Sequence, residues 1–336
     1  MPRVGIAFQS DKTLAEYREL ASIVDRYDFA TVSVYQDLFY QPPWPALFQF
    51  AENTRTPLLG PAVINPYLTH PVLVAANLAL LDRTSGGRAY LGVGRGAFFE
   101  AIGVPQPRPL AAIRETVELV QRLLEGDRSP YRGEIFQASE QAYLRFTIPG
   151  RKLPVLLGGW GERIAKLAGE IADIFKVGGS ANPGSVSWFR QRIEEGARKA
   201  GRDPAAVKLA FGAVTVVDRD RSKAESIARR EVAMYVGAVA RLEPVAPPPE
   251  EEIRTVEAAL ASGDEKRAGE ALSRETLRRF ACFGTPEDIA VQLTELFDAG
   301  VDLFELGTPH GIDEVRAIEV LGAELLPRLP SLDRIP

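Results

Sequence analysis

Short apolar runs alternate along the chain with longer stretches of helical periodicity. Residues 4–8 are apolar, and apolar side chains then recur every three or four positions between residues 13 and 27. A short apolar run is typical of a buried strand, and the recurring spacing is typical of an amphipathic helix. The chain is therefore predicted to begin with a strand followed by a helix.

The same strand–helix unit recurs seven more times. The remaining predicted strands cover residues 31–35, 58–64, 89–93, 155–157, 173–177, 207–217 and 301–306. The helices that follow them are predicted near residues 45–53, 71–83, 110–124, 162–170, 185–201, 221–239 and 313–325. Eight alternating units predict an α/β fold, a (β/α)8 TIM barrel, as one domain over residues 1–336.

Two stretches interrupt this alternation. Residues 131–146 alternate enough to predict an extra hairpin. Residues 243–274 open with prolines and glutamates and continue as charged, helix-like sequence without a clear apolar stripe. We interpret the second stretch as an insertion before the last unit. It is either a mobile flap over the barrel mouth, or a surface helix pair or dimer contact.

Composition and charge exclude several classes of function. The chain has 40 basic and 45 acidic residues, a net charge of −5, and no basic cluster suited to nucleic acid. Its apolar runs are shorter than the roughly 18 residues of a membrane span. Cys282 is the only cysteine and His70 and His310 are the only histidines, so no disulfide and no metal centre is expected. The start of the chain lacks a signal-peptide pattern, which favours the cytoplasm.

Glycines follow several predicted strands. Residues 91–97 formally match a dinucleotide-binding fingerprint, but they follow the fourth strand and lack the acidic partner of that motif. In a barrel, the same glycines suit a strand end that passes close to a flat ligand. Glycine pairs at 158–159 and 178–179 each follow a predicted strand and precede a predicted helix. Because the start of a helix attracts anions, these positions favour a phosphate site. Tight turns without any ligand are the alternative.

Several dispersed motifs together resemble one superfamily, the luciferase-like flavin and deazaflavin oxidoreductases. They lie at residues 60–67, 81–89, 91–96, 168–173 and 283–288. The chain is most similar to the branch that uses the deazaflavin coenzyme F420, which includes methylenetetrahydromethanopterin reductase. The resemblance implies hydride transfer between F420 and a small organic substrate, and a homodimer. An FMN-dependent monooxygenase of the same fold is the alternative.

The resemblance also implies where the cofactor is bound, at the C-terminal mouth of the barrel. A non-prolyl cis peptide bond is implied between Ala62 and Val63, in a bulge of the third strand behind the ring. The coenzyme phosphate is implied at Gly158, Gly159, Gly178, Gly179 and Ser180. Further cofactor contacts are implied at Asn65, Arg95 and Gly96. Asn65 also suits a turn, and Arg95 also suits an ion pair with Glu100.

Candidate catalytic and substrate-binding residues complete the expected site. Asp37, Gln36 and His310 are the catalytic candidates, and Tyr67 and Glu100 are the candidate substrate contacts. Relatives carry an Asp-His pair where this chain has Gln36 and Asp37, so no histidine is expected there. Hydride transfer without an accompanying proton does not require a histidine as an acid or base at this position.

Two further departures from the family concern the substrate. Ala7 stands where methanopterin reductases have a glutamate, and Ala97 stands where sugar-phosphate dehydrogenases have one. The sequence therefore supports neither of those substrates and leaves the substrate open.

Overall fold

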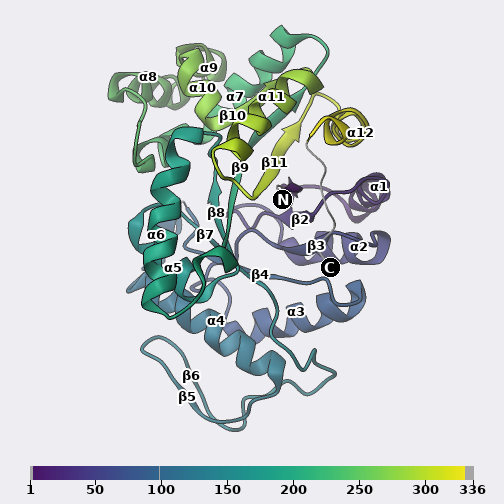
Figure 1. Cartoon of the computed structure of the whole chain (residues 1–336), viewed down its shortest axis with the longest axis vertical. Helices are drawn as coiled ribbons and strands as arrows, with labels where there is room; N and C mark the ends of the chain where they lie inside the picture. The colour runs from purple at the N-terminus through teal and green to yellow at the C-terminus, as the bar shows by residue number, and fades with distance from the viewer. Residues whose placement is uncertain (1–2, 98, 330–336) are drawn as a thin grey trace.

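The computed structural model describes residues 3–97 and 99–329 and contains a barrel of parallel strands surrounded by helices (Figure 1). Hydrogen bonds join the barrel strands in the order β3-β2-β1-β11-β9-β8-β7-β4. Single bridges from Leu59 to Ala89 and from Ile64 to Val93 close the ring between β3 and the β4 segment. The predicted (β/α)8 barrel is confirmed.

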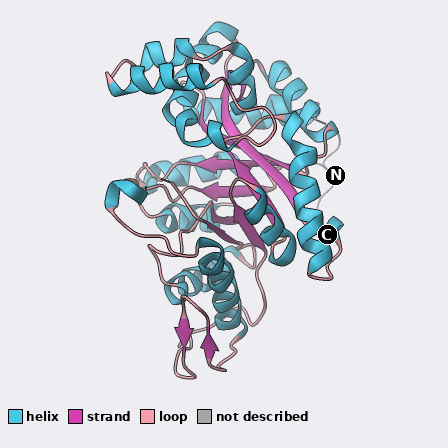
Figure 2. Ribbon diagram, turned by 90° about the vertical axis from the view of Figure 1, so that its left-hand side faces the viewer, coloured by secondary structure: helices cyan, strands magenta, loops and turns pink. Residues whose placement is uncertain are grey.

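The barrel strands lie close to the predicted positions. They are β1 (Arg3–Phe8), β2 (Thr31–Val34), β3 (Leu58–Pro61), β4 (Leu91–Gly94), β7 (Val155–Gly158), β8 (Ile174–Gly178), β9 (Lys208–Val217) and β11 (Leu303–His310). The strands run through the middle of the molecule with helices on the outside (Figure 2). The buried faces of strands and helices meet in one large apolar core.

Each barrel strand is followed by a helix. These helices are α1 (Leu14–Val24), α2 (Pro43–Asn53), α3 (Pro71–Ser85), α4 (Pro109–Glu125), α5 (Glu162–Ile171), α6 (Val186–Lys199), α7 (Arg221–Val239) and α12 (Glu314–Val320). Local chemistry sets their ends. Thr13 and Glu16 form a capping box at the start of α1, and Gly86, at φ +72°, ends α3.

The first and last strands of the barrel are neighbours. β1 pairs in parallel with β11 from Arg3 opposite Leu303 to Ile6 opposite Leu306. β2 pairs with the other edge of β1. The barrel is thus closed by strands that lie about 300 positions apart in the sequence.

The predicted hairpin is present but short. β5 (Tyr131–Arg132) and β6 (Gln137–Ala138) pair antiparallel and project at the bottom of Figure 1. The carboxylate of Glu115 on α4 accepts the backbone N–H groups of Glu134, Ile135 and Phe136. This buried carboxylate fixes the hairpin loop to the barrel.

The insertion is a packed helical layer beside α7. Residues 243–274 contain α8 (Glu250–Ala261) and α9 (Glu265–Ala271). They are followed by α10 (Arg274–Phe280), β10 (Ala281–Gly284) and α11 (Pro286–Asp298). Ile253, Val256 and Ala259 are buried in a second apolar cluster with α7. The expectation that this segment lacks an apolar stripe is wrong, because these three apolar residues recur at helical spacing and supply one.

A ninth strand extends one side of the barrel. β10 pairs in parallel with the second half of β9, from Ala281 opposite Val214 to Gly284 opposite Val217. Neither β10 nor α11 is among the predicted elements. β9 is ten residues long, so its first half pairs with β8 and its second half with β10.

Candidate active site

A bulge after β3 occupies the centre of the candidate site. The Ala62–Val63 peptide bond is cis, as the resemblance implies. A Cβ atom built at Gly94 would lie 2.5 Å from Val63 Cγ2, and one built at Gly158 would lie 2.8 Å from Val63 Cγ1. The glycines that end β4 and β7 therefore make room for the Val63 side chain. The bulge packs across both strand ends.

The end of β2 brings two polar side chains to the same mouth. The exposed carboxylate of Asp37 accepts a hydrogen bond of 2.9 Å from Gln9 Nε2. Partial loss of water around Asp37 raises its pKa, while the hydrogen bond from Gln9 and the charge of Lys176 oppose that rise. The Oε1 atom of Gln36 is buried and has no hydrogen-bond donor among the described residues.

A buried ion pair lies inside the barrel. Lys176 on β8 pairs with Glu305 on β11, and both side chains are nearly inaccessible to solvent. The two strands flank β9, where a Cβ atom at Gly212 would lie 3.3 Å from both Lys176 Cε and Glu305 Cβ. Burial lowers the pKa of Lys176 to about 7. The sequence analysis missed this pair.

Hydroxyl groups surround the carboxylate of Glu305. Ser33 donates to it, and Thr31 donates to it over 3.5 Å. The hydroxyl of Tyr90 lies 2.5 Å from that of Ser33 and donates to the carbonyl of Gly60 at 3.0 Å. Because buried charges are costly without such partners, this set is a satisfied polar layer.

The glycine pairs expected to bind phosphate use their backbone N–H groups within the fold. Gly159 N donates to Lys176 O at 3.0 Å, and Gly179 N and Ser180 N both donate to Gly212 O, at 2.6 and 3.0 Å. Ser180 is fully buried. These three N–H groups are therefore engaged in hydrogen bonds within the barrel, and the role of these residues in cofactor binding stays a prediction. Gly178 is exposed, and a Cβ atom there would meet nothing within 4 Å.

Two predicted contact residues brace the loops around the mouth. Asn65 is 2% exposed, accepts the backbone N–H of Tyr67 at 2.7 Å and donates to Arg95 O. The Tyr67 hydroxyl donates to Pro107 O. The turn geometry expected of Asn65 is therefore present, and its role in ligand binding stays a prediction.

The loop after β4 carries the remaining predicted contacts. Arg95 is exposed, and its Nε donates to Gln106 Oε1 at 2.7 Å. The partner of its guanidinium is thus Gln106, where the sequence also suits Glu100. Glu100 is exposed on a 3-10 turn (Phe99–Ile102). Gly96 has φ +71° and packs against the ring of Phe99.

His310 is not at the mouth surface. Its side chain is fully buried, with Nδ1 3.1 Å from Glu314 Oε1 and Nε2 3.3 Å from Leu306 O. Its ring also contacts Phe8. This burial beside Glu314 on α12 does not favour a catalytic role, and the role of His310 stays a prediction. His70 caps α3 by accepting the N–H of Val72.

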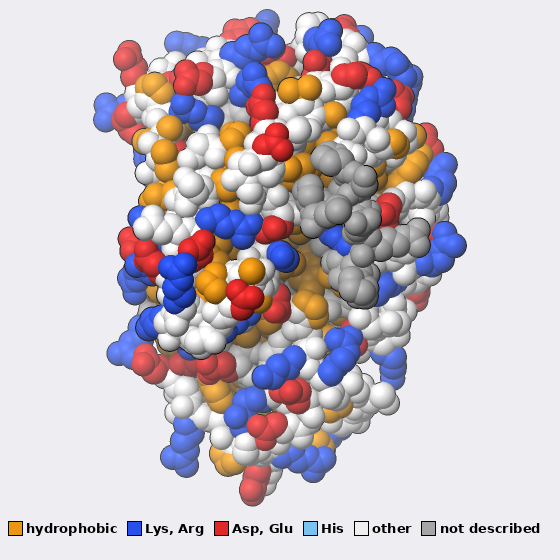
Figure 3. All heavy atoms as spheres, viewed as in Figure 1, with side chains coloured by type: hydrophobic (Ala, Val, Ile, Leu, Met, Phe, Trp, Pro, Cys, Tyr) orange, Lys and Arg blue, Asp and Glu red, His pale blue; other side chains and the backbone are white. Residues whose placement is uncertain are grey.

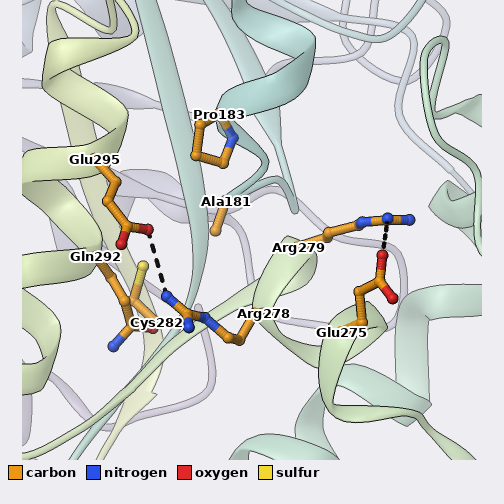
Figure 4. A pocket seen from close by; sticks show the side chains of 8 residues that line it. All are labelled: Ala181, Pro183, Glu275, Arg278, Arg279, Cys282, Gln292 and Glu295. Carbon is orange, nitrogen blue, oxygen red and sulfur yellow. Dashed lines mark hydrogen bonds and ion pairs between the residues drawn. The ribbon is translucent and has the colours of Figure 1, made fainter.

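A pocket of about 410 Å³ lies beside the loop after β8 (Figure 4). Ala181 lines it, and its N–H donates to Arg279 O at 2.7 Å. Arg278 pairs with Glu295, and Arg279 pairs with Glu275. These arginines are already neutralised by partners from the chain itself.

Residues 3–97 and 99–329 show no sign of a metal centre or of a membrane-spanning helix. They contain no group of three or more His, Cys, Asp or Glu that could hold a metal ion. No helix among them is long and apolar enough to cross a membrane. Positive and negative side chains are interspersed over the face in Figure 3.

Comparison with known proteins decides the family. The family model described as luciferase-like monooxygenase matches residues 2–303. The chain belongs to this family. The resemblance seen in the motifs is thereby confirmed.

Individual members of the luciferase-like family match over nearly the whole chain. The 5,10-methylenetetrahydromethanopterin reductase of Archaeoglobus fulgidus is 32% identical over 97% of this chain and 99% of its own length. The F420-dependent glucose-6-phosphate dehydrogenase of Nakamurella multipartita is 25% identical over 95% and 93%. The solved F420-dependent tetrahydromethanopterin reductase of Methanopyrus kandleri superposes with a TM-score of 0.89, at 28% identity over 98% and 99%.

The structure brings together only part of the site predicted for this luciferase-like protein. The ends of β2, β3, β4, β7 and β8 meet at one mouth, which holds Gln36, Asp37, Val63 and Gly178. Gln9, Lys176 and Glu305 belong to the same region and were missed. Lys176 and Glu305 could have been recognised in the sequence, because each is a charged residue within an otherwise apolar stretch of a strand.

Proposed function

We propose that this protein is an F420-dependent oxidoreductase that transfers hydride between the deazaflavin and a small organic substrate at the barrel mouth. The observation that carries the proposal is the Val63 bulge, which presents an apolar surface across Gly94 and Gly158. A flat ring needs such a rigid support on one face, so that its other face stays open to a substrate. The relatives named above as F420-dependent support the choice of cofactor.

Two other features fit the cofactor. The buried Oε1 atom of Gln36 has no donor in the described part of the chain, and an N–H or O–H group on a ring bound at the mouth would satisfy it. Gly178 leaves open space at the end of β8, where a phosphate could approach the backbone. Val63, Gln36 and Gly178 would therefore hold the ring and the adjoining chain.

F420, when bound, supplies the ring carbon that gives or accepts the hydride. The chain's own contribution is binding and orientation. Val63 fixes the depth of the ring, and Asp37 accepts a hydrogen bond from a substrate or cofactor donor while Gln9 holds its carboxylate in place. Val63, packed on Gly94 and Gly158, would shield the closed face of the ring from water.

An F420 titration tests the proposal directly. Purified protein is titrated with F420 and with FMN by fluorescence quenching, and oxygen consumption is followed with each reduced form. Selective binding of F420 without rapid oxygen consumption supports hydride transfer. Tight FMN binding with rapid oxygen consumption would overturn the proposal in favour of the monooxygenase chemistry in the family's description. Methylenetetrahydromethanopterin is the first substrate to test, because a whole-length relative is named for its reduction.

A homodimer in the cytoplasm is part of the same proposal. The outer face of α3 exposes Leu73 (59% exposed) and Leu80 (41% exposed), two turns apart. Apolar side chains on one helix face suit contact with a second copy of the chain. Light scattering of the native protein and of a Leu80→Glu variant tests this arrangement. A native monomer would contradict it.

A further inference from the structure

The side chain of Tyr35 is half-buried directly after the end of β2, at the mouth of the barrel. Its hydroxyl has no hydrogen-bond partner among residues 3–97 and 99–329. Burial raises the pKa of this hydroxyl, which therefore keeps its proton at neutral pH. A polar group that is partly removed from water without gaining a partner is costly. The unused O–H group is therefore suited to bond a ligand at the mouth.

Contacts with β1 and with the barrel interior fix the place of this phenol. The Tyr35 N–H donates to Phe8 O at 2.9 Å, and the Tyr35 carbonyl accepts the Ser10 hydroxyl at 3.1 Å. The ring faces the interior, because the ammonium of Lys176 lies 5.5 Å from its centroid. Both backbone polar groups are thus satisfied, and only the hydroxyl is left to bond a ligand.

Small residues on two neighbouring strands leave room for the phenol. On β11, Gly307 stands two positions after Glu305 and so faces the same interior. A Cβ atom at Gly307 would lie 3.1 Å from the Tyr35 hydroxyl oxygen. On β1, Ala7 stands two positions after Gly5, the partner of Glu305, and is small as well. The phenol therefore starts on β2, crosses β1 and ends beside β11.

The same phenol lies beside the bulge that is proposed to support the coenzyme ring. β2 and β3 are paired, and Ala62 N donates to Val34 O at 2.9 Å. The next residues on the two strands are Tyr35 and Val63, so the phenol and the bulge lie at the same level. The hydroxyl is therefore placed beside a substrate that stacks on a ring over Val63.

We propose that the Tyr35 hydroxyl binds the substrate by donating a hydrogen bond to the oxygen or nitrogen atom bonded to the carbon that exchanges hydride. This inference rests on the proposed function and narrows its substrate class. Carbonyl compounds and carbons bonded to an amine nitrogen belong to that class. Compounds without an acceptor atom on the reacting carbon do not.

A fixed O–H donor at this place favours the reduction of such a carbon. When the substrate carbon receives the hydride, the electron pair of its bond moves to the oxygen or nitrogen atom, where negative charge grows. The hydrogen bond from Tyr35 is therefore stronger in the transition state than in the ground state. Tyr35 keeps its proton. Water protonates the oxygen or nitrogen atom, and water also takes up the proton that the reduced coenzyme loses.

The test compares two variants that each lose one phenolic oxygen. Tyr35→Phe removes the proposed donor and keeps the ring. Tyr40→Phe is the matched control, because it makes the same change on the same loop at a tyrosine that is 52% exposed. Turnover is measured with reduced F420 and either 5,10-methylenetetrahydromethanopterin or a panel of simple ketones and aldehydes. Calorimetry measures substrate binding to the protein loaded with oxidised F420, where no reduction occurs.

We expect kcat to fall about 100-fold in Tyr35→Phe, because a donor aimed at developing charge is lost. Substrate binding to the complex with oxidised F420 should weaken only about fivefold, as for one ordinary hydrogen bond. F420 affinity and the free energy of unfolding should stay at the wild-type values. A merely structural role of Tyr35 would change these two quantities and would not separate kcat from binding. Tyr40→Phe should match the wild type throughout.

Three outcomes would overturn the inference, and they are distinguishable. An unchanged kcat in Tyr35→Phe, or an equal fall in Tyr40→Phe, would reject the role of Tyr35 and leave the proposed function standing. Binding of F420 without turnover of any of these substrates would reject the substrate class. Failure of the wild type to bind F420 would reject the proposed function itself, and this inference with it.

Discussion

The side chain of Val63 fills the space that a side chain at Gly158 would need, with Val63 Cγ1 2.8 Å from the position of the missing Cβ. The glycine that ends β7 is therefore required by packing against the bulge after β3. The sequence pattern favours phosphate binding at a glycine that ends a strand, but the structure shows that Gly158 makes room for an apolar side chain from the bulge after β3, two strands away in the barrel.

Gly158→Ala should disturb the bulge. We expect it to lower the free energy of unfolding by about 1–3 kcal/mol and to weaken F420 binding about tenfold, because Val63 must move. Denaturant unfolding and F420 titration measure the two effects. The cost should shrink in a Val63→Ala background, where the obstructing methyl groups are absent. An equal cost in both backgrounds would contradict the direct contact.

Gly178→Ala tests the cofactor role of the loop after β8. A Cβ atom at this position meets nothing within 4 Å, so the free energy of unfolding should change by less than about 0.5 kcal/mol. If phosphate approaches the backbone here, F420 affinity should fall while stability is retained. Unchanged F420 affinity would remove Gly178 from the cofactor site.

His310→Ala should act on stability rather than on the chemical step. The variant loses contacts to Glu314, Leu306 and Phe8, and we expect the free energy of unfolding to fall by about 1–3 kcal/mol. The kcat of the folded variant should stay within a few-fold of the wild type. A loss of kcat by several orders of magnitude, with stability retained, would restore the catalytic role expected from the sequence.

Asp288 at the start of α11 should contribute acid-sensitive stability. Hydrogen bonds from Arg221 and from Thr285 lower its pKa to about 2. A carboxylate with a lowered pKa in the folded state stabilises the fold above its unfolded pKa, and this contribution is lost as the pH falls toward 2. Asp288→Asn should therefore cost about 0.5–1 kcal/mol at pH 7.

The pH dependence of that cost is measured by urea unfolding at several pH values between 7 and 3. The difference between wild type and Asp288→Asn should be constant down to about pH 4 and narrow below it. Arg221→Gln provides the control, since the same substitution of Asp288 should cost less in that background. If the difference in free energy of unfolding were independent of pH, the charge of the Asp288 carboxylate would not contribute to stability.

Cys282 should be chemically inert in the native protein. It is 1% exposed, and burial raises the pKa of its thiol to about 12. A chromogenic disulfide reagent should find no reactive thiol in native protein and one thiol per chain after denaturation. Rapid native labelling would mean that the pocket wall formed by β10 opens in solution.

Most of the fold could be predicted because local signals agree with it. The helix from Arg221 to Val239 has the bounds that the sequence predicts, and the Asp220 side chain caps its start. β10 was missed, because a strand of four residues directly after a charged helix gives almost no periodicity. α11 was predictable, because Ile289, Leu293 and Leu296 recur at helical spacing on its buried face.

The candidate site was only partly predictable, for a different reason. Lys176 and Glu305 lie 129 positions apart, and neither strand alone shows that they meet. Their contact depends on Gly212 in a third strand and on barrel closure. The strand position of His310 indicates the correct end of the barrel, but its burial against Glu314 and Phe8 depends on residues far from it in the sequence or on the next helix, and the pattern does not show it.

The pairing of β1 with β11 bears on how the protein is made. During synthesis, residues 3–6 are translated long before their partners at 303–306, which follow about 300 residues later. Until β11 is synthesised, the edge of β1 that pairs with β11 has no partner. This edge is then open to mispairing with other chains. Nascent chains that stop before β11 should be the aggregation-prone species, and chaperone dependence should end once that strand has left the exit tunnel.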